Sequence, residues 1–478
     1  MKKQVLFAIA TMTLASCSSD GLVNNSSSGG GEAPIAFSVE KKNITRGTQN
    51  LEDTKHYNFG VWAYKVKGSN SQLVMDNYLV GYSNETTKKG YEHSGCSTWA
   101  ATIGDQDDHT SPWFYENLGT SEYTYTGTDG YYTKNDGNYT SANANQILRY
   151  WDLAYTNTNF YAYAPYNKNV EFKESTNGTK TMIFDAKNTI RDGYDNPLNS
   201  AYAGFDRSLS EYMYAGVQAT NSAKKDVIVP FKHMGAQVNV RFYEDIPNYR
   251  VEIIDLGADN GTFATGVKDD LKKGIQATPA VKGTGDSYTK GSYFTTNGAT
   301  VTFAADATPT FDYTTEGSSS TSDNLMFKLP TTNLDNTTIS GHNLLPQEGD
   351  GKYSESPTVY YAVAQKDSET GFTFHISYRI IAEDNKEVIT VHNATVFVPA
   401  KDGSEFIAAW QPNVKYTYSF KITKNSTGTT NPETDIKPTD PTPSTTKSLY
   451  PIVFDGATIE DYSEKYPVSE VSGENTNY

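Results

Sequence analysis

The stretch AQVNVRF at residues 236–242 decides the fold class of this chain. Its apolar residues alternate with Gln, Asn and Arg, and residues two apart along a β-strand point to the same face of a sheet. The pattern therefore predicts a strand that is buried on one side. The run DVIVPFKH at 226–233 precedes it and is also strand-like, and Gly235 is placed between the two to hold a bulge that resets the register.

Further strand-like runs extend from this stretch in both directions. They are short and separated by turns rich in Gly, Asn and Asp, and no helical stripe of useful length accompanies them. Such runs lie at 59–64, 160–165, 251–256, 358–363, 371–381, 388–398 and 415–423. This spacing is typical of antiparallel β-sandwiches, so we expect an all-β protein.

Length and charge set the number of domains and argue against one class of partner. The chain has 478 residues, beyond the size at which a single core keeps growing, so we expect two β-sandwich domains, at 35–247 and 248–424. The formal net charge is −16 and the sequence has no concentrated basic face. We therefore expect no nucleic-acid partner.

The beginning of the chain reads as an export signal. Lys2 and Lys3 precede an apolar run that is too short to cross a bilayer as a helix, and the run ends in LASC at Cys17, which resembles a bacterial lipobox. We predict a signal peptide at 1–16, a lipid on the Cys17 sulfur and a flexible stalk at 17–34. A plain secretory signal followed by an unmodified Cys17 is the alternative.

A first strand is expected at 35–46, directly after the stalk. Ile35, Phe37 and Val39 alternate with smaller or polar residues and so share one face. Burial of these three side chains contributes about 5 to 9 kcal/mol before the cost of ordering them, at about 1.5 to 3 kcal/mol for each. This segment is therefore expected to be a firmly seated strand.

A polar, Tyr-rich insertion occupies residues 91–146. Its Tyr–Thr runs are separated by turn signals such as Asp-Gly, which predict hairpins and surface loops. Exposed Tyr rings beside Asn, Thr and Asp are typical of surfaces that bind sugars or proteins, so the insertion supplies an alternative function as an adhesin. The carboxylates within Asp105–Asp108 lack EF-hand spacing, and either a bound cation or a solvated acidic loop accounts for them, the loop being the simpler reading.

The end of the chain combines a linker with a strand-like tail. Residues 425–448 are rich in Thr and Pro and have no apolar pattern, which indicates an extended linker that reaches about 75 Å when fully stretched. The tail at 449–478 contains PIVF at 451–454, which echoes PIAF at 34–37. A chance likeness between two ordinary strand starts is the alternative to a shared role.

Taken together, these features resemble the fimbrillins, the lipoprotein precursors of the type V pili of Bacteroidales. Each motif is weak by itself, but in this order they cover most of residues 14–423. They are the lipobox at Cys17, Ile35-x-Phe37 with Thr45-Arg46, Trp151 with Phe160-Tyr161-Ala162-Tyr163-x-Pro165, Tyr212-Met213-Tyr214-Ala215, Phe231-x-His233-x-x-Ala236-x-Val238, Leu344-Leu345-Pro346-Gln347, and Trp410-x-x-Asn413-x-x-Tyr416-x-Tyr418-x-Phe420.

This resemblance implies two transthyretin-like antiparallel β-sandwich domains with a C-terminal extension. It implies a structural subunit of a surface fimbria, exported as an outer-membrane lipoprotein and cut by a trypsin-like protease between Arg46 and Gly47. Cleavage removes the first strand together with the stalk, and a strand of another copy or a related subunit takes its place. The alternative for Arg46 is a residue that only ends a strand in a solvated turn.

The physical basis of such an exchange is general. A sandwich that lacks one strand exposes unpaired backbone groups and an open apolar core, which accept a suitable strand from elsewhere. We expect the tail to be the replacement, with Ile452 and Phe454 in the places of Ile35 and Phe37.

The likeness between the two segments weakens after these positions. Gly456 aligns with Val39, which interrupts the apolar face of the tail. A bulge at Gly456 would let Ala457 and Ile459 continue that face.

The sequence carries no motif for catalysis or cofactor binding. Its seven His residues lack the spacing of metal ligands, and it has no nucleophile elbow, phosphate loop or paired-cysteine knuckle. We therefore expect no enzyme activity, no cofactor and no metal. The expected partners are other copies or related subunits, the maturation protease, the outer membrane through the lipid and, for the adhesin alternative, a host glycan or protein.

Overall fold

The described part of the chain is almost entirely β-structure. The computed structural model describes residues 33–39, 58–84, 89–91, 113–119, 123–125, 131–134, 146–185, 209–258, 274–282, 288–290, 293–318, 325–330, 342–356, 359–361, 364–365, 370–423 and 452–461. Within these ranges the helices are two short 3-10 turns, η1 (Leu209–Glu211) and η2 (Asn221–Ala223). The predicted all-β fold is confirmed.

Several predicted features fall outside these residues. They include the signal peptide with Cys17, residues 40–46 of the predicted first strand with the Arg46–Gly47 bond, the carboxylates within Asp105–Asp108, and the linker at 425–448. Across the part of the chain that the structure describes, no helix is long and apolar enough to span a membrane.

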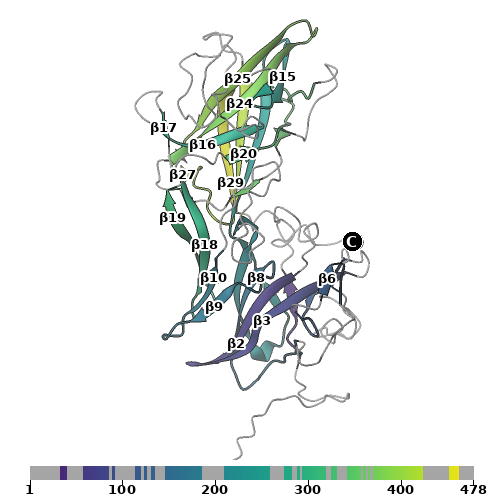
Figure 1. Ribbon diagram of the computed structural model, residues 1–478, viewed down its shortest axis with the longest axis vertical. Helices are drawn as coiled ribbons and strands as arrows, with labels where there is room; N and C mark the ends of the chain where they lie inside the picture. The colour runs from purple at the N-terminus through teal and green to yellow at the C-terminus, as the bar shows by residue number, and fades with distance from the viewer. Residues whose placement is uncertain are drawn as a thin grey trace, which may run out of the picture.

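A central sheet organises the N-terminal body, in the lower half of Figure 1. Its main strands run in the order β13, β11, β8, β2, β3, and each pairs antiparallel with its neighbour. These strands are β13 (Lys232–His233), β11 (Met213–Thr220), β8 (Asn157–Ala164), β2 (Asn58–Lys67) and β3 (Asn70–Asn84). The sheet continues beyond β3 through β4 (Lys89–Tyr91), β7 (Tyr131–Lys134) and β6 (Tyr123–Tyr125), and β5 (Trp113–Phe114) also pairs with β3.

Both faces of this sheet are buried, because β2 and β8 carry apolar residues on both sides. Phe160 and Ala162 of β8 enter one core, whereas Tyr161 and Tyr163 enter a second core on the other face. Strands that read as continuous apolar runs are typical of sheets covered on both sides. The N-terminal body therefore has three layers, one more than the simple sandwich that the sequence predicts.

Two smaller sheets form the outer layers. On one face β1 (Phe37–Val39) pairs parallel with β12 (Val227–Val229), over the core that contains Phe160. On the other face lies the sheet β19 (Pro309–Ser318), β18 (Tyr293–Phe303), β10 (Lys180–Phe184), β9 (Glu171–Glu174), with β23 (Ala364–Gln365) paired to β18.

The C-terminal body is a two-sheet sandwich, in the upper half of Figure 1. One sheet contains β21 (Ser354–Glu355), β14 (Ala236–Asp245), β28 (Val414–Thr423) and β29 (Ile452–Asp461), with β22 (Val359–Tyr361) also paired to β14. The facing sheet contains β15 (Tyr249–Ile254), β24 (Thr370–Ala382), β16 (Ile275–Lys282), β17 (Tyr288–Lys290), β25 (Val388–Val398) and β20 (Leu325–Phe327). A separate hairpin joins β26 (Lys401–Asp402) to β27 (Glu405–Phe406).

Two strands belong to the body on the other side of the domain boundary that the sequence suggests between residues 247 and 248. β14 precedes that boundary, yet its apolar side chains lie in the C-terminal core. β18 follows the boundary, yet it pairs with β10 of the N-terminal body. Strand pairing between distant segments, which sequence periodicity does not report, decides these placements.

The two bodies are joined by a hydrogen-bonded turn at 233–235. The His233 amide donates to Asn413 Oδ1 at 3.0 Å, the Asn413 amide donates to the Gly235 carbonyl at 3.0 Å, and Tyr313 Oη donates to the Met234 carbonyl at 2.6 Å. The predicted bulge at Gly235 is wrong, because this bend ends one sheet and starts another instead of resetting the register within one strand.

Candidate functional site

The first strand lies between two backbone edges. On one side the Val227 amide donates to the Ala36 carbonyl at 2.9 Å, within the parallel pairing of β1 with β12. On the other side the Ile35 amide donates to the Arg149 carbonyl at 2.7 Å, and the Trp151 amide donates to the Ala33 carbonyl at 3.0 Å. Loss of this segment would leave unpaired backbone groups on both sides.

Ile35 and Phe37 fill the core beneath this segment, as the sequence predicts. Ile35 is 1% exposed and Phe37 is fully buried. The Phe37 ring packs edge to face against Phe59, Tyr115 and Phe160, with ring centroids 5.7, 5.8 and 5.6 Å apart. Such aromatic pairs contribute about 0.5 to 1.5 kcal/mol each beyond the burial of area. The side chain of Val39 lies outside what the structure describes.

We refer to the surroundings of the first strand as the β1 seat. It provides backbone hydrogen-bonding groups on both sides of residues 33–39 and aromatic rings beneath Phe37. The β1 seat consists of Phe59, Tyr115, Arg149–Trp151, Phe160 and Val227–Val229.

Tyr115 is the residue of the β1 seat that the sequence least suggests. It lies within the insertion at 91–146, for which the sequence predicts hairpins and surface loops, yet it is 1% exposed. Its hydroxyl donates to the Ile35 carbonyl at 2.9 Å and accepts a hydrogen bond from the Arg149 amide at 3.1 Å. Burial raises the pKa of the Tyr115 phenol, so the hydroxyl remains a donor at neutral pH.

Part of the insertion is therefore core rather than surface, which corrects the expectation. Besides Tyr115, the buried residues among the described part of the insertion are Tyr91, Trp113, Phe114 and Leu118. The run Trp113-Phe114-Tyr115 was the available signal, because three consecutive large aromatic residues are costly to leave exposed.

The tail forms a strand on its own C-terminal body. β29 pairs antiparallel with β28, from Ile422 opposite Ile452 to Val414 opposite Asp461. It also contacts β25 of the facing sheet, so it closes one side of the sandwich.

The predicted bulge at Gly456 is present. The register shifts between Tyr418 and Phe420, and Gly456 has a φ of 112°, in a region that favours glycine. Because of this bulge, the apolar side chains of the tail on both sides of it face one core. Ile452 is 6% exposed in that core, and Phe454, Ala457 and Ile459 pack against it.

In the uncut chain the two similar segments thus occupy different cores. Phe37 contacts Phe59 and Phe160 of the N-terminal body, whereas the Phe454 ring lies 6.0 Å from Phe420 and 6.4 Å from Tyr418 of the C-terminal body. A shared pocket for the two segments stays a prediction, which concerns a chain from which the first strand has been removed.

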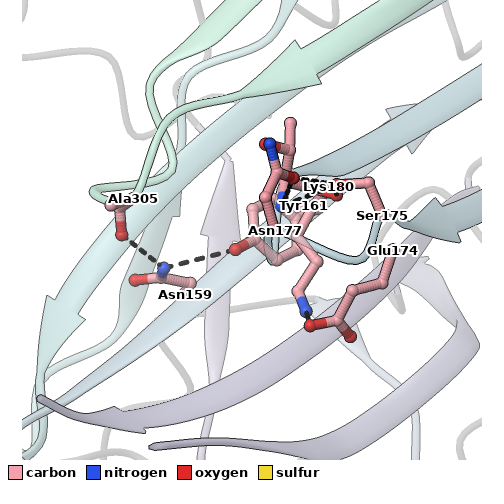
Figure 2. Close-up of polar contacts among 8 residues, drawn as sticks. Asn159, Tyr161, Glu174, Ser175, Asn177, Lys180 and Ala305 are labelled. Atoms are coloured by element: carbon pink, nitrogen blue, oxygen red, sulfur yellow. Dashed lines mark hydrogen bonds and ion pairs between the residues drawn. The ribbon is translucent and has the colours of Figure 1, made fainter. Parts of the chain in front are cut away.

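Polar contacts, which Figure 2 shows, join β8 to the turn after β18 and join β9 to β10. Asn159 Nδ2 donates to Tyr161 Oη at 3.2 Å and to the Ala305 carbonyl at 2.9 Å. The Lys180 ammonium pairs with Glu174, and it lies 4.1 Å from the centre of the Tyr64 ring. Burial raises the pKa of Tyr64 to about 12.

These contacts link neighbouring strands and layers. Tyr161 is 2% exposed and the Lys180 side chain is 6% exposed, whereas the Glu174 side chain is 44% exposed. Within the described ranges, no set of three or more His, Cys, Asp or Glu residues is arranged to hold a metal ion.

Comparison with known proteins gives distant structural neighbours only. No protein-family model and no curated protein matches the sequence. A fimbrial protein from Bacteroides vulgatus is similar over 90% of this chain and 99% of its own, with 13% identity and a TM-score of 0.43. A candidate cell adhesion protein from Bacteroides uniformis is similar over 90% of this chain and 98% of its own, with 11% identity and a TM-score of 0.33. Similarity this distant carries no argument about function, which rests on the strands described above.

Proposed function

We propose that this chain is a structural subunit of a cell-surface fimbria, a fimbrillin, that polymerises by donor-strand exchange. The precursor is exported as an outer-membrane lipoprotein carrying a lipid on Cys17. A trypsin-like protease cuts between Arg46 and Gly47, the first strand leaves with the stalk, and a strand from a second copy enters the β1 seat.

The observation that carries this proposal is the attachment of residues 33–39 on two sides, through β1 to β12 and through residues 33–35 to residues 149–151. This segment is hydrogen-bonded to backbone on two sides and buries the Phe37 ring. Its removal would therefore expose unpaired backbone groups and part of the apolar core together. An open slot of this kind is a template for strand addition. A cut after Arg46 separates β1 from the strands that follow it in the chain.

The tail supports the proposal through its position at the end of a long linker. β29 follows residues 425–448, which are long enough to carry it to another molecule. In the precursor it pairs with β28, so it cannot serve another molecule until it leaves β28. Assembly therefore needs two events, the departure of β1 by cleavage and the release of β29 from its own body.

The adhesin alternative has less physical support from the described residues. The buried part of the insertion, including Phe114 and Tyr115, belongs to the core and presents no aromatic surface. An enzyme activity gains no specific support from any described group.

Cleavage of the purified precursor tests the proposal. Treatment of the full chain with a trypsin-like protease should produce a ladder of oligomers that resist detergent and separate on boiling. The Arg46→Ala variant is the matched control and should remain monomeric under the same treatment. Oligomers of equal yield from Arg46→Ala, or a monomeric product from fully cleaved wild type, would contradict the proposal.

A further inference from the structure

We propose that Tyr115 fixes the register of whichever strand fills the β1 seat, by donating its hydroxyl hydrogen to a backbone carbonyl of that strand. The identity of the incoming strand rests on the proposed function. The contact itself is already made in the uncut chain, where the Tyr115 hydroxyl lies 2.9 Å from the Ile35 carbonyl oxygen.

A hydrogen bond to a backbone carbonyl does not depend on the side chain of the residue that carries it. Tyr115 can therefore hold strands of different sequence, provided that a carbonyl reaches the position of the Ile35 oxygen. The Tyr115 ring also packs edge to face on Phe37, with centroids 5.8 Å apart. The Tyr115 side chain thus contacts both the backbone of the strand and the aromatic residue two places further along it.

The tail strand meets both requirements. Ile452 and Phe454 have the same spacing as Ile35 and Phe37. With Phe454 of a second copy in the Phe37 pocket, the Ile452 carbonyl of that copy receives the Tyr115 hydroxyl. A strand shifted by one residue would offer neither the carbonyl nor the ring, because successive residues of a strand point to opposite sides.

The Tyr115 hydroxyl has a second acceptor for the period when the seat is empty. The Arg149 carbonyl oxygen lies 3.3 Å from Tyr115 Oη, and the Arg149 amide donates to the same oxygen at 3.1 Å. Rotation of the hydroxyl hydrogen from Ile35 to Arg149 keeps the Tyr115 hydroxyl itself hydrogen-bonded. Because an unpaired buried donor is costly, this second acceptor lowers the cost of emptying the seat.

Tyr115 is anchored independently of β1. Gln146 Nε2 donates to the Tyr115 carbonyl at 2.8 Å and to the Leu79 carbonyl at 2.7 Å, and Gln146 Oε1 accepts from the Leu79 amide at 2.5 Å. Leu79 belongs to β3 of the central sheet, so this anchor does not involve the first strand. Tyr115 therefore keeps its position after the first strand has left.

Amide hydrogen exchange on the full, uncut chain tests whether the Tyr115 hydroxyl holds the strand. In Tyr115→Phe, the amides of Ile35 and Val227, which bond across β1, should exchange about five to ten times faster than in wild type. The amides of Asn117 and Gln146, which bond within the loop that carries Tyr115, should keep their wild-type rates. A merely structural role for Tyr115 would accelerate both groups.

Tyr78→Phe is the matched control. Tyr78 lies beside Tyr115, with ring centroids 5.9 Å apart, and its hydroxyl accepts from Arg149 Nε at 3.0 Å. It should leave the exchange of Ile35 and Val227 unchanged. Unchanged exchange at Ile35 and Val227 in Tyr115→Phe, or equal acceleration in the loop of Tyr115, would overturn the proposal.

A second measurement tests the Tyr115 hydrogen bond separately from the fimbrial function. The full chain, nicked after Arg46, is mixed with a fluorescent peptide of residues 33–41, in which an ester replaces the peptide bond after Ile35 and weakens its carbonyl as an acceptor. The ester should reduce capture about fivefold in wild type and have no effect in Tyr115→Phe. An equal loss of capture in both proteins would refute the role of Tyr115. A loss in wild type alone, without any fibre formation, would refute only the fimbrial function.

Discussion

Tyr243 Oη donates a hydrogen bond to Asp455 Oδ2 at 2.6 Å, and this contact ties β14 to the tail strand β29. Since β29 pairs with β28, the contact to β14 reaches across the intervening strand and adds a second attachment. The tail is therefore held on its own body by a backbone ladder, by apolar burial and by a side-chain clasp. Any role for the tail in another molecule begins with the loss of these contacts.

Removal of the hydrogen bond between Tyr243 and Asp455 should speed up assembly. Tyr243→Phe deletes the hydroxyl but keeps the ring, so it should weaken tail docking by about 1 kcal/mol and raise its release rate about fivefold. Light scattering after protease cleavage should show faster polymerisation. Slower polymerisation in Tyr243→Phe would indicate that the docked tail assists assembly.

A tail locked to its own body should block assembly. Thr417 and Thr458 face each other across the β28–β29 pair, and directly opposed residues of antiparallel strands lie within the range that a disulfide spans. The oxidised Thr417→Cys/Thr458→Cys chain should be cut normally yet stay monomeric, and reduction should restore the ladder. The single variant Thr417→Cys is the control, and polymerisation of the oxidised double variant would exclude the tail as the donor.

Truncation of the Phe37 ring should weaken the resident strand. Phe37→Ala removes a fully buried ring that contacts three other aromatic rings, so the free energy of unfolding should fall by about 3 to 5 kcal/mol. Urea unfolding of the uncut chain measures this change. Ile228→Ala on the neighbouring β12, where Ile228 is 57% exposed, should change it by less than about 0.5 kcal/mol. Similar values for the two variants would show that Phe37 does not anchor the strand.

Acid should destabilise the joint between the two bodies through His233. Burial lowers the pKa of His233 to about 3, well below the ordinary value of 6.5. The unfolded chain then binds a proton between pH 6.5 and pH 3 that the folded chain does not bind. The free energy of unfolding should therefore fall as the pH drops through this window, by up to about 1.4 kcal/mol per pH unit.

Glu244 acts in the opposite direction and must be separated from His233. Burial raises the pKa of Glu244 from 4.5 to about 7, against the opposing effect of Arg250, so its contribution is lost as the pH rises through this range. Urea unfolding of wild type and His233→Gln, from pH 7 to pH 4, isolates the histidine, because Glu244 is common to both. Parallel pH profiles for the two proteins would contradict the assignment to His233.

The sequence predicted local patterns well where a period of two residues was clear. The alternation at 236–242 gave a strand with one buried face, and the face shared by Ile35 and Phe37 is buried as expected. Gly456 was identified as a bulge because a glycine interrupted an otherwise apolar face, and the structure has the bulge there. Each of these predictions depends on neighbouring residues only.

Placement of those strands in three dimensions was not predictable in the same way. Nothing in the residue pattern indicates that β18 joins β10 in a third layer, or that β14 belongs to the C-terminal core. Nor did it show that Tyr115, inside a polar insertion, touches the first strand. These relationships join residues far apart in the chain, and single-strand periodicity carries no information about the partner.

The sequence by itself therefore determined that the chain is built of strands and which face of several strands is apolar, because side-chain direction alternates along any extended backbone. Only the tertiary structure decided which core each face enters, that the first strand is held on both rims, and that the tail rests on its own body. The physical reason is that burial and strand pairing are satisfied between segments that the order of residues does not place together.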